Sequence, residues 1–134
     1  DIDLYMDQVL SIMEKQLLCP EQAQSLSAPM VNNYVKANLL TRAHKKKYAR
    51  EHLARLSMIG MLKQVLPLKE LESLFTSMEG EEEDRYEVFC DLLDKGKQAL
   101  IEDLEEEKEN LVLEMAIKSY LYQALATSLL EEEK

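Results

Sequence analysis

The chain has 134 residues and a net charge of −10, and 46% of its residues are apolar. That length fits one domain, or a small domain with a helical appendage, and the apolar content excludes an intrinsically disordered chain. No stretch approaches the ~18 continuous apolar residues of a membrane span. With only three glycines and three prolines, and with strong helix formers dominating, the chain is expected to adopt a mainly α fold.

The two cysteines, Cys19 and Cys90, are far apart and form no Cys-x-x-Cys pair. A disulfide framework or a thiolate zinc site would need more cysteines than this. We therefore expect two reduced thiols and a cytoplasmic protein.

Helical spacing of apolar residues predicts a first helix over residues 4–18. A short helix is predicted over residues 28–37, with Ser27 as its N-cap and Pro29 in its first turn. Asn38 can adopt the left-handed conformation that closes a helix.

A small β-hairpin is predicted next, with Leu39–Leu40 and Lys47–Tyr48 as its arms. Further helices are predicted over residues 50–65, 68–78, 85–106 and 111–130. The last of these is apolar almost all round, as in a helix that is buried on most sides. Two explanations stay open: it closes the core of a single domain, or a second copy of the chain covers it.

Charge is distributed very unevenly. Between Ala28 and Lys69 there are nine basic residues and one acid, Glu51, so this block carries +8 while the rest of the chain carries −18. The nine are Lys36, Arg42, Lys45, Lys46, Lys47, Arg50, Arg55, Lys63 and Lys69. Such a block indicates a surface for a polyanion, most plausibly nucleic acid.

The order of residues in the block favours double-stranded DNA. Asn32, Asn33 and Lys36 are predicted on the outer side of the short helix, and asparagine suits adenine edges while lysine suits phosphate. The cluster from Arg42 to Lys47 follows, including Lys45 and Lys46, and Arg50 and Arg55 open the next helix, where phosphate is favoured. Lys45–Lys47 as an ordinary solvated loop is the alternative.

Catalytic patterns are nearly absent. His44 and His52 both lie in the basic block without a ligand spacing to Cys, Asp or Glu, and His52 is expected to be a surface or half-buried helix residue. No glycine-rich phosphate loop or nucleophile motif occurs. We expect neither an enzyme nor a bound metal or cofactor.

Two segments, MVNNYVKANLL (residues 30–40) and KKKYAREHLARLSMIGMLKQVLPLKELESLF (residues 45–75), together resemble the DNA-binding domain of MerR-type transcriptional regulators. Tyr34 matches the tyrosine of the recognition helix, and Tyr48 the tyrosine after the wing. The resemblance implies a winged helix-turn-helix, a dimer formed through C-terminal helices, and a distorted operator. It implies backbone or groove contacts for Tyr34, Lys36, Arg42 and Lys45–Lys47.

About the first 75 residues also resemble a family of uncharacterised proteins from Gram-positive bacteria, a domain of unknown function, through DIDLYMDQV, MVNNYVK, KKKYAREHLA and LKQVL. We therefore expect a MerR-like winged helix-turn-helix with a small β-hairpin wing in residues 1–79. A C-terminal helical lobe for dimerisation or effector binding is expected in residues 80–134.

The expected function is that of a DNA-binding transcriptional regulator, with the 28–37 helix in the major groove and the 41–47 loop on the backbone. The alternative is a protein-interaction module that keeps the fold but not operator binding, and whose basic face docks an acidic partner. Steep salt dependence would favour the first of these.

Overall fold

The computed structural model describes residues 3–14, 26–78, 80–104 and 109–132. Within these ranges the helices are α1 (Met6–Glu14), α2 (Ala28–Lys36), α3 (Arg50–Leu62), α4 (Leu68–Ser77), α5 (Glu82–Leu104) and α6 (Leu111–Glu132). The expectation of a mainly α-helical chain is confirmed. The predicted ends of the first helix near residue 18 and of the fifth near residue 106 lie outside the described residues.

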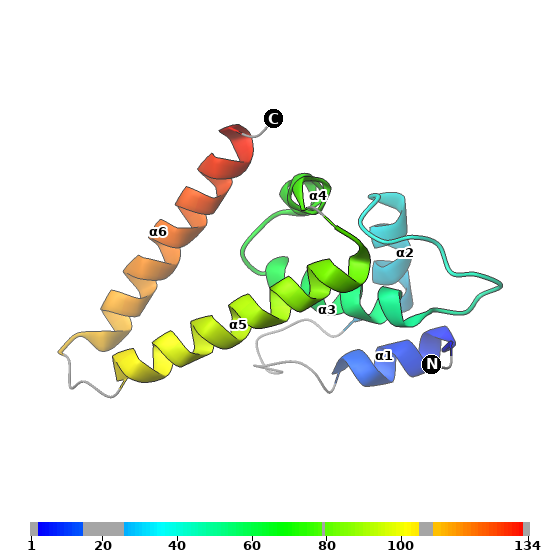
Figure 1. Cartoon of the computed structure of the whole chain (residues 1–134), viewed down its shortest axis with the longest axis horizontal. Helices are drawn as coiled ribbons and strands as arrows, with labels where there is room; N and C mark the ends of the chain where they lie inside the picture. The colour runs from blue at the N-terminus through cyan, green and yellow to red at the C-terminus, as the bar shows by residue number, and fades with distance from the viewer. Residues whose placement is uncertain (1–2, 15–25, 79, 105–108, 133–134) are drawn as a thin grey trace.

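The helices α1 to α4 surround one apolar core. Val9 of α1, Val31 of α2, Ile59 of α3 and Leu71 of α4 are each fully buried in it. The first turns of α5 pack across α3, and the C-terminal part of α6 contacts α4. Figure 1 shows α5 and α6 reaching away from this core on one side and diverging from their connected ends.

Local capping fixes both ends of α2, as the sequence predicts. The Ser27 hydroxyl accepts a hydrogen bond from the backbone N–H three residues on, at 3.4 Å. At the other end Asn38 is left-handed, with φ 62°, and its N–H donates to the Val35 carbonyl at 3.1 Å. The Leu39 N–H donates to the Tyr34 carbonyl at 2.9 Å, which completes a Schellman motif.

The prediction of a β-hairpin wing between α2 and α3 is wrong, and so is the prediction of a winged helix-turn-helix. Only isolated β-bridges, and no strand, occur in the described part of the chain. Tyr48 exchanges two backbone hydrogen bonds with Leu4, of 2.8 and 2.7 Å, instead of pairing with Leu39–Leu40. The physical reason is that Leu39 and Leu40 follow directly after the Schellman motif and are buried in the core.

No helix among the described residues combines the length and hydropathy that crossing a membrane requires.

Candidate nucleic-acid interface

The helix α2 has one face in the core and one in solvent. Asn32, Asn33 and Lys36 are exposed, whereas Val31 and Tyr34 are buried. The two amides and the ammonium group are therefore free to meet a ligand on the outer side of a helix whose inner side is anchored.

Tyr34, which the resemblance implies as a groove contact, lies in this core. Its side chain is only 4% exposed, and its hydroxyl accepts a hydrogen bond from Lys63 Nζ at 3.2 Å. The tyrosine thus positions α2 against α3 from the inside, and its ring does not reach the outer surface.

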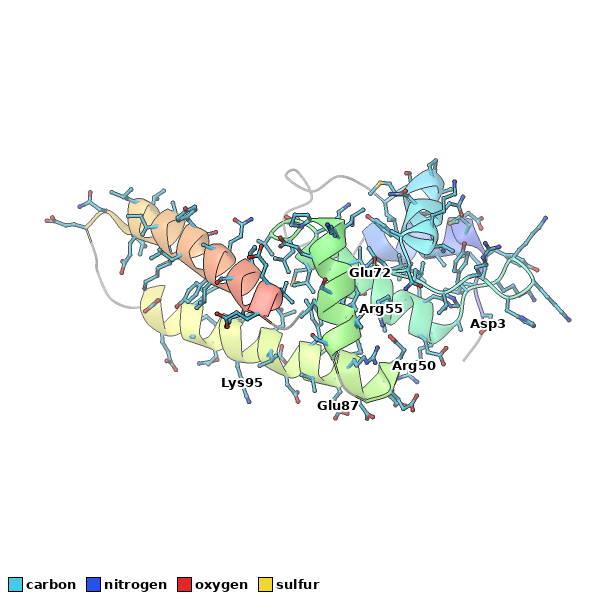
Figure 2. The ribbon with its side chains drawn as sticks, turned by 90° about the horizontal axis from the view of Figure 1, so that it is seen from above. Asp3, Arg50, Arg55, Glu72, Glu87 and Lys95 are labelled. Atoms are coloured by element: carbon cyan, nitrogen blue, oxygen red, sulfur yellow. The ribbon has the colours of Figure 1, made fainter. Side chains whose placement is uncertain are left out.

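Four exposed cations follow α2 in the basic loop, which we define as residues 41–47: Arg42, Lys45, Lys46 and Lys47. Lys45 and Lys46 are both left-handed, with φ 51° and 65°, and form a two-residue turn. His44 and Lys47 bond to each other across it at 3.0 and 2.9 Å. This single pairing is too short to make a strand, but it projects the loop beyond the helices at the same end as α2 (Figures 1 and 2).

The charges of this end are not neutralised locally. Among the described residues, no carboxylate forms an ion pair with Lys36, Arg42, Lys45, Lys46 or Lys47. Since unneutralised like charges held on one loop attract polyanions, the loop keeps its full positive charge for a partner.

His52 holds the base of the basic loop, a role that the sequence did not reveal. Its Nδ1 accepts a hydrogen bond from the Ala49 N–H at 2.9 Å, so the ring proton is placed on Nε2. Nε2 lies 3.1 Å from Thr41 Oγ1 and 3.3 Å from the Arg42 carbonyl oxygen. The buried imidazole thereby ties the start of α3 to the start of the loop. The only sequence signal for this role was the position of His52, three residues after the N-cap residue Ala49, where a side chain can accept a hydrogen bond from the N-cap N–H.

The N-terminal segment supports the other end of the loop. The Leu4–Tyr48 bridge fixes the chain just before α3. Lys47 Nζ lies 5.2 Å from the centroid of the Tyr5 ring, a cation–π geometry. Residues ahead of α1 therefore orient the last lysine of the basic loop.

Arg50 and Arg55, the two α3 candidates, differ in position. Arg50 is exposed at the first residue of α3, beside the basic loop. Arg55 is folded inward: its Nε donates to Glu82 Oε2 at 3.2 Å, its Nη2 donates to Glu82 Oε1, and its Cζ lies 4.1 Å from the Phe75 ring centroid. Arg55 thus joins α3, α4 and α5 and is set back from the loop (Figure 2).

Acids border the basic end on its α3–α5 side. A cavity of about 820 Å³ there is lined by Asp3, Glu51 and Glu81–Glu83 together with Arg50. The positive surface therefore runs from α2 to the basic loop and ends near Arg50.

A second cavity, of about 630 Å³, lies between α6 and the α3–α4 region. Its walls are mainly apolar and include Leu66, Leu74 and Leu129. Gln123 Nε2 donates to the Val65 carbonyl beside it at 2.7 Å. Lacking charge, this cavity does not suit a polyanion.

A family model described as a domain of unknown function (DUF1836) matches residues 1–93. The chain belongs to this family. The match includes α1 to α4, the basic loop and α5 up to residue 93, and it leaves α6 outside. No curated protein and no solved structure matches the chain.

Proposed function

We propose that this chain is a transcriptional regulator that binds double-stranded DNA through α2 and the basic loop. The observation that carries the proposal is the end of the molecule where Asn32, Asn33 and Lys36 lie next to Arg42 and Lys45–Lys47. These side chains are all exposed, and the cations among them have no ion-pair partner in the described residues.

The chemistry of these groups divides into two tasks. Lysine and arginine contact phosphates and set the position on the duplex, whereas side-chain amides distinguish base edges in the major groove. A helix fits that groove, and α2 offers its amide-bearing face outward. We therefore assign sequence preference to Asn32 and Asn33, and general affinity to Lys36, the basic loop and Arg50.

The resemblance of residues 30–40 and 45–75 to MerR-type regulators supports this assignment, although the hairpin wing of that fold is absent. The two thiols expected to be reduced favour a cytoplasmic protein, and the resemblance to an uncharacterised family of Gram-positive bacteria favours that source. Tyr34 is buried, and Arg55 is folded against α4 and α5, so both are left out of the proposed contact surface.

Acidity elsewhere in the chain is the main physical objection. The residues outside the basic block carry −18, and charges closer than about 8 Å repel DNA at physiological salt. Acids that border the basic end, among them Asp3 and Glu51, line the cavity on its α3–α5 side. A module that docks an acidic protein remains the competing function, because its partner would use the same cations.

The first experiment replaces Lys45, Lys46 and Lys47 with alanine. Fluorescence anisotropy with random duplex should show weaker binding to every sequence. The slope of log affinity against log salt should become shallower by about 2–3, at roughly 0.9 for each lost phosphate contact. The matched control replaces Lys69, Lys95 and Lys97, which removes the same charge from exposed positions outside the loop and should leave the slope nearly unchanged.

The second experiment replaces Asn33 with alanine and repeats a selection from a random duplex library. The preferred sequence should change, with about 1–3 kcal/mol of discrimination lost at one base pair. If the unaltered protein binds no duplex at low salt and enriches no motif, the regulator function fails and the acidic-partner module replaces it.

A further inference from the structure

The imidazole of His52 uses both of its nitrogens at the base of the basic loop. The residue is only 7% exposed, and its Nδ1 accepts a hydrogen bond from the Ala49 N–H at 2.9 Å. Its Nε2 lies 3.3 Å from the Arg42 carbonyl oxygen and 3.1 Å from Thr41 Oγ1. A carbonyl oxygen only accepts, so Nε2 carries the ring proton and Nδ1 keeps its lone pair. These hydrogen bonds, which we call the His52 anchor, therefore need a neutral ring.

A second proton on the ring is incompatible with the His52 anchor. The proton can only be added to Nδ1, and this turns the acceptor of the Ala49 N–H into a donor. A doubly protonated ring has no acceptor left in any orientation. It has to move away from the Ala49 N–H, and the hydrogen bonds of Nε2 to the start of the loop move with it.

The surroundings of His52 offer no charge that would compensate a second proton. The Tyr48 ring packs edge-on against the imidazole, with ring centroids 5.3 Å apart. The acids of residues 3–12 and of α3 are Asp3, Asp7 and Glu51, and all three are exposed. Among the described residues, no carboxylate is bonded to the ring. The cations of the loop and of α3 are Arg42, Lys45, Lys46, Lys47, Arg50 and Arg55. A second proton therefore adds unpaired positive charge to a cationic end of the molecule.

The basic loop depends on its base because its tip is strained. Lys45 and Lys46 are both left-handed, with φ 51° and 65°, a conformation that glycine adopts more readily than lysine. Two backbone hydrogen bonds between His44 and Lys47 hold the turn. The exposed cations of the loop also repel one another. Without the His52 anchor, the loop is therefore expected to relax and to lose the shape in which it projects.

We infer that His52 is a pH-sensitive switch for the basic loop: as the pH falls, protonation of Nδ1 opens the His52 anchor and the loop loses its order. Histidine suits this task because its charge changes between about pH 8 and pH 5. The opening of the loop does not involve DNA. Its consequence for DNA rests on the proposed function: a loop that is ordered in only a fraction of the molecules binds with an affinity lowered by that fraction.

The second histidine of the loop, His44, should act in the opposite direction. It is exposed, so a second proton on its ring adds positive charge without disturbing the His52 anchor. Added positive charge strengthens binding to phosphates. Every measurement is therefore made in the His44→Gln chain, which leaves His52 as the histidine that titrates in this part of the molecule.

The first measurement follows the order of the loop without DNA, in the ¹⁵N-labelled full chain at about pH 7.5 and about pH 5.5. The heteronuclear NOE of the amides of residues 42–47 should fall at the lower pH, while far-UV circular dichroism stays unchanged. His52→Gln is the matched variant, because glutamine at this position of a capping box accepts a hydrogen bond from the N-cap N–H but does not titrate. It should keep the loop ordered at both pH values, whereas His52→Ala should leave it disordered at both.

The second measurement is the affinity for random duplex, by fluorescence anisotropy at the same two pH values and constant ionic strength. Affinity should fall at least about threefold at the lower pH, within the limit of about tenfold per pH unit for one coupled proton. Adding His52→Gln should abolish this fall.

Equal loop order at both pH values overturns the inference, and so does a loss of order that persists when His52→Gln is added. A loop that loses order at low pH in a chain that binds no duplex supports the switch and rejects the proposed function instead. The two failures are therefore distinguishable.

Discussion

The α1–α4 core and the α5–α6 pair use the same residue types in opposite ways. Ile59 of α3 is 0% exposed, whereas Ile117 of α6 is 50% exposed. The core satisfies its apolar side chains within one chain, while α5 and α6 have more apolar surface than α3 and α4 can cover. The comparison teaches that apolar content alone does not tell a helix that is buried in a core from one whose apolar side chains stay exposed.

The border between the two regions runs through α5. Tyr86 and Phe89 pack against the core, but Leu92 is 62% exposed. The family match ends at residue 93, close to this change. The part of the chain that the family model describes is thus mostly the part that packs on itself.

The largest expected difference between the regions is in the free energy of unfolding when one isoleucine of each region is replaced with alanine. Ile59→Ala should lower the free energy of unfolding by about 2–5 kcal/mol, because it leaves a cavity among buried side chains. Ile117→Ala should change it by less than about 0.5 kcal/mol, because the Ile117 side chain is half exposed. Urea unfolding measures both, and equal losses in the two variants would contradict the difference between the regions.

A smaller effect is expected where the regions are joined. Arg55→Ala removes the ion pair with Glu82 and the contact with Phe75, so unfolding should become easier by about 1–3 kcal/mol. Arg42→Ala, an exposed arginine of the basic loop, should cost less than about 0.5 kcal/mol. If the two arginines have equal effects on urea unfolding, Arg55 does not hold α5 to the core.

Glycine substitutions should act in opposite directions. Gly96→Ala should stabilise the monomer by about 0.5–1 kcal/mol, because the position is helical and a Cβ meets nothing within 4 Å. Gly80→Ala should destabilise it, since Gly80 has φ +91° and its Cβ would lie 3.3 Å from the Asp84 Cβ. Thermal unfolding of dilute protein measures both. A loss of stability in Gly96→Ala would mean that the monomer already packs against this position.

The smallest effect is a pH dependence at the seam between α3 and α5. Burial raises the pKa of the Tyr86 hydroxyl above its usual 10.0, and a hydrogen bond with Cys90 adds to this. The folded chain therefore holds this proton more tightly than the unfolded chain. The stability that the group contributes is present below pH 10 and is lost as the pH rises through the folded pKa.

Tyr86→Phe should reduce the loss in free energy of unfolding between pH 9 and pH 11, measured by urea unfolding at each pH. Tyr120→Phe, an exposed tyrosine of α6, is the matched control and should leave the decline as it is. An unchanged slope in Tyr86→Phe would show that the seam is open to solvent.

The sequence predicted the helices well and their surroundings less well. The ends of α2 follow from Ser27 and Asn38, because capping hydrogen bonds join residues a few positions apart. The basic block could also be identified from the sequence alone, because it depends only on the number of charged residues in one segment. The prediction of a β-hairpin was wrong because two apolar residues such as Leu39 and Leu40 fit either a strand or a buried core segment. The local sequence pattern does not distinguish these two structures.

The tertiary structure decided which predicted site residues reach the surface. Arg55 is one of the nine cations of the basic block. Its guanidinium nevertheless donates a hydrogen bond to Glu82, which lies 27 positions further along the chain. His52 supports the basic loop through Thr41, 11 positions away. Such partners depend on how helices pack, so charge counts and short-range spacing do not identify them.

By itself the sequence determined a mainly helical chain, the limits of α2, and a basic segment in an acidic protein, since these depend on neighbouring residues. Only the tertiary structure decided that Tyr34 and Arg55 turn inward, that the basic loop projects without a β-hairpin, and that α6 stays uncovered. The physical reason is the same in each case: burial and ion pairing depend on distances between segments far apart in sequence.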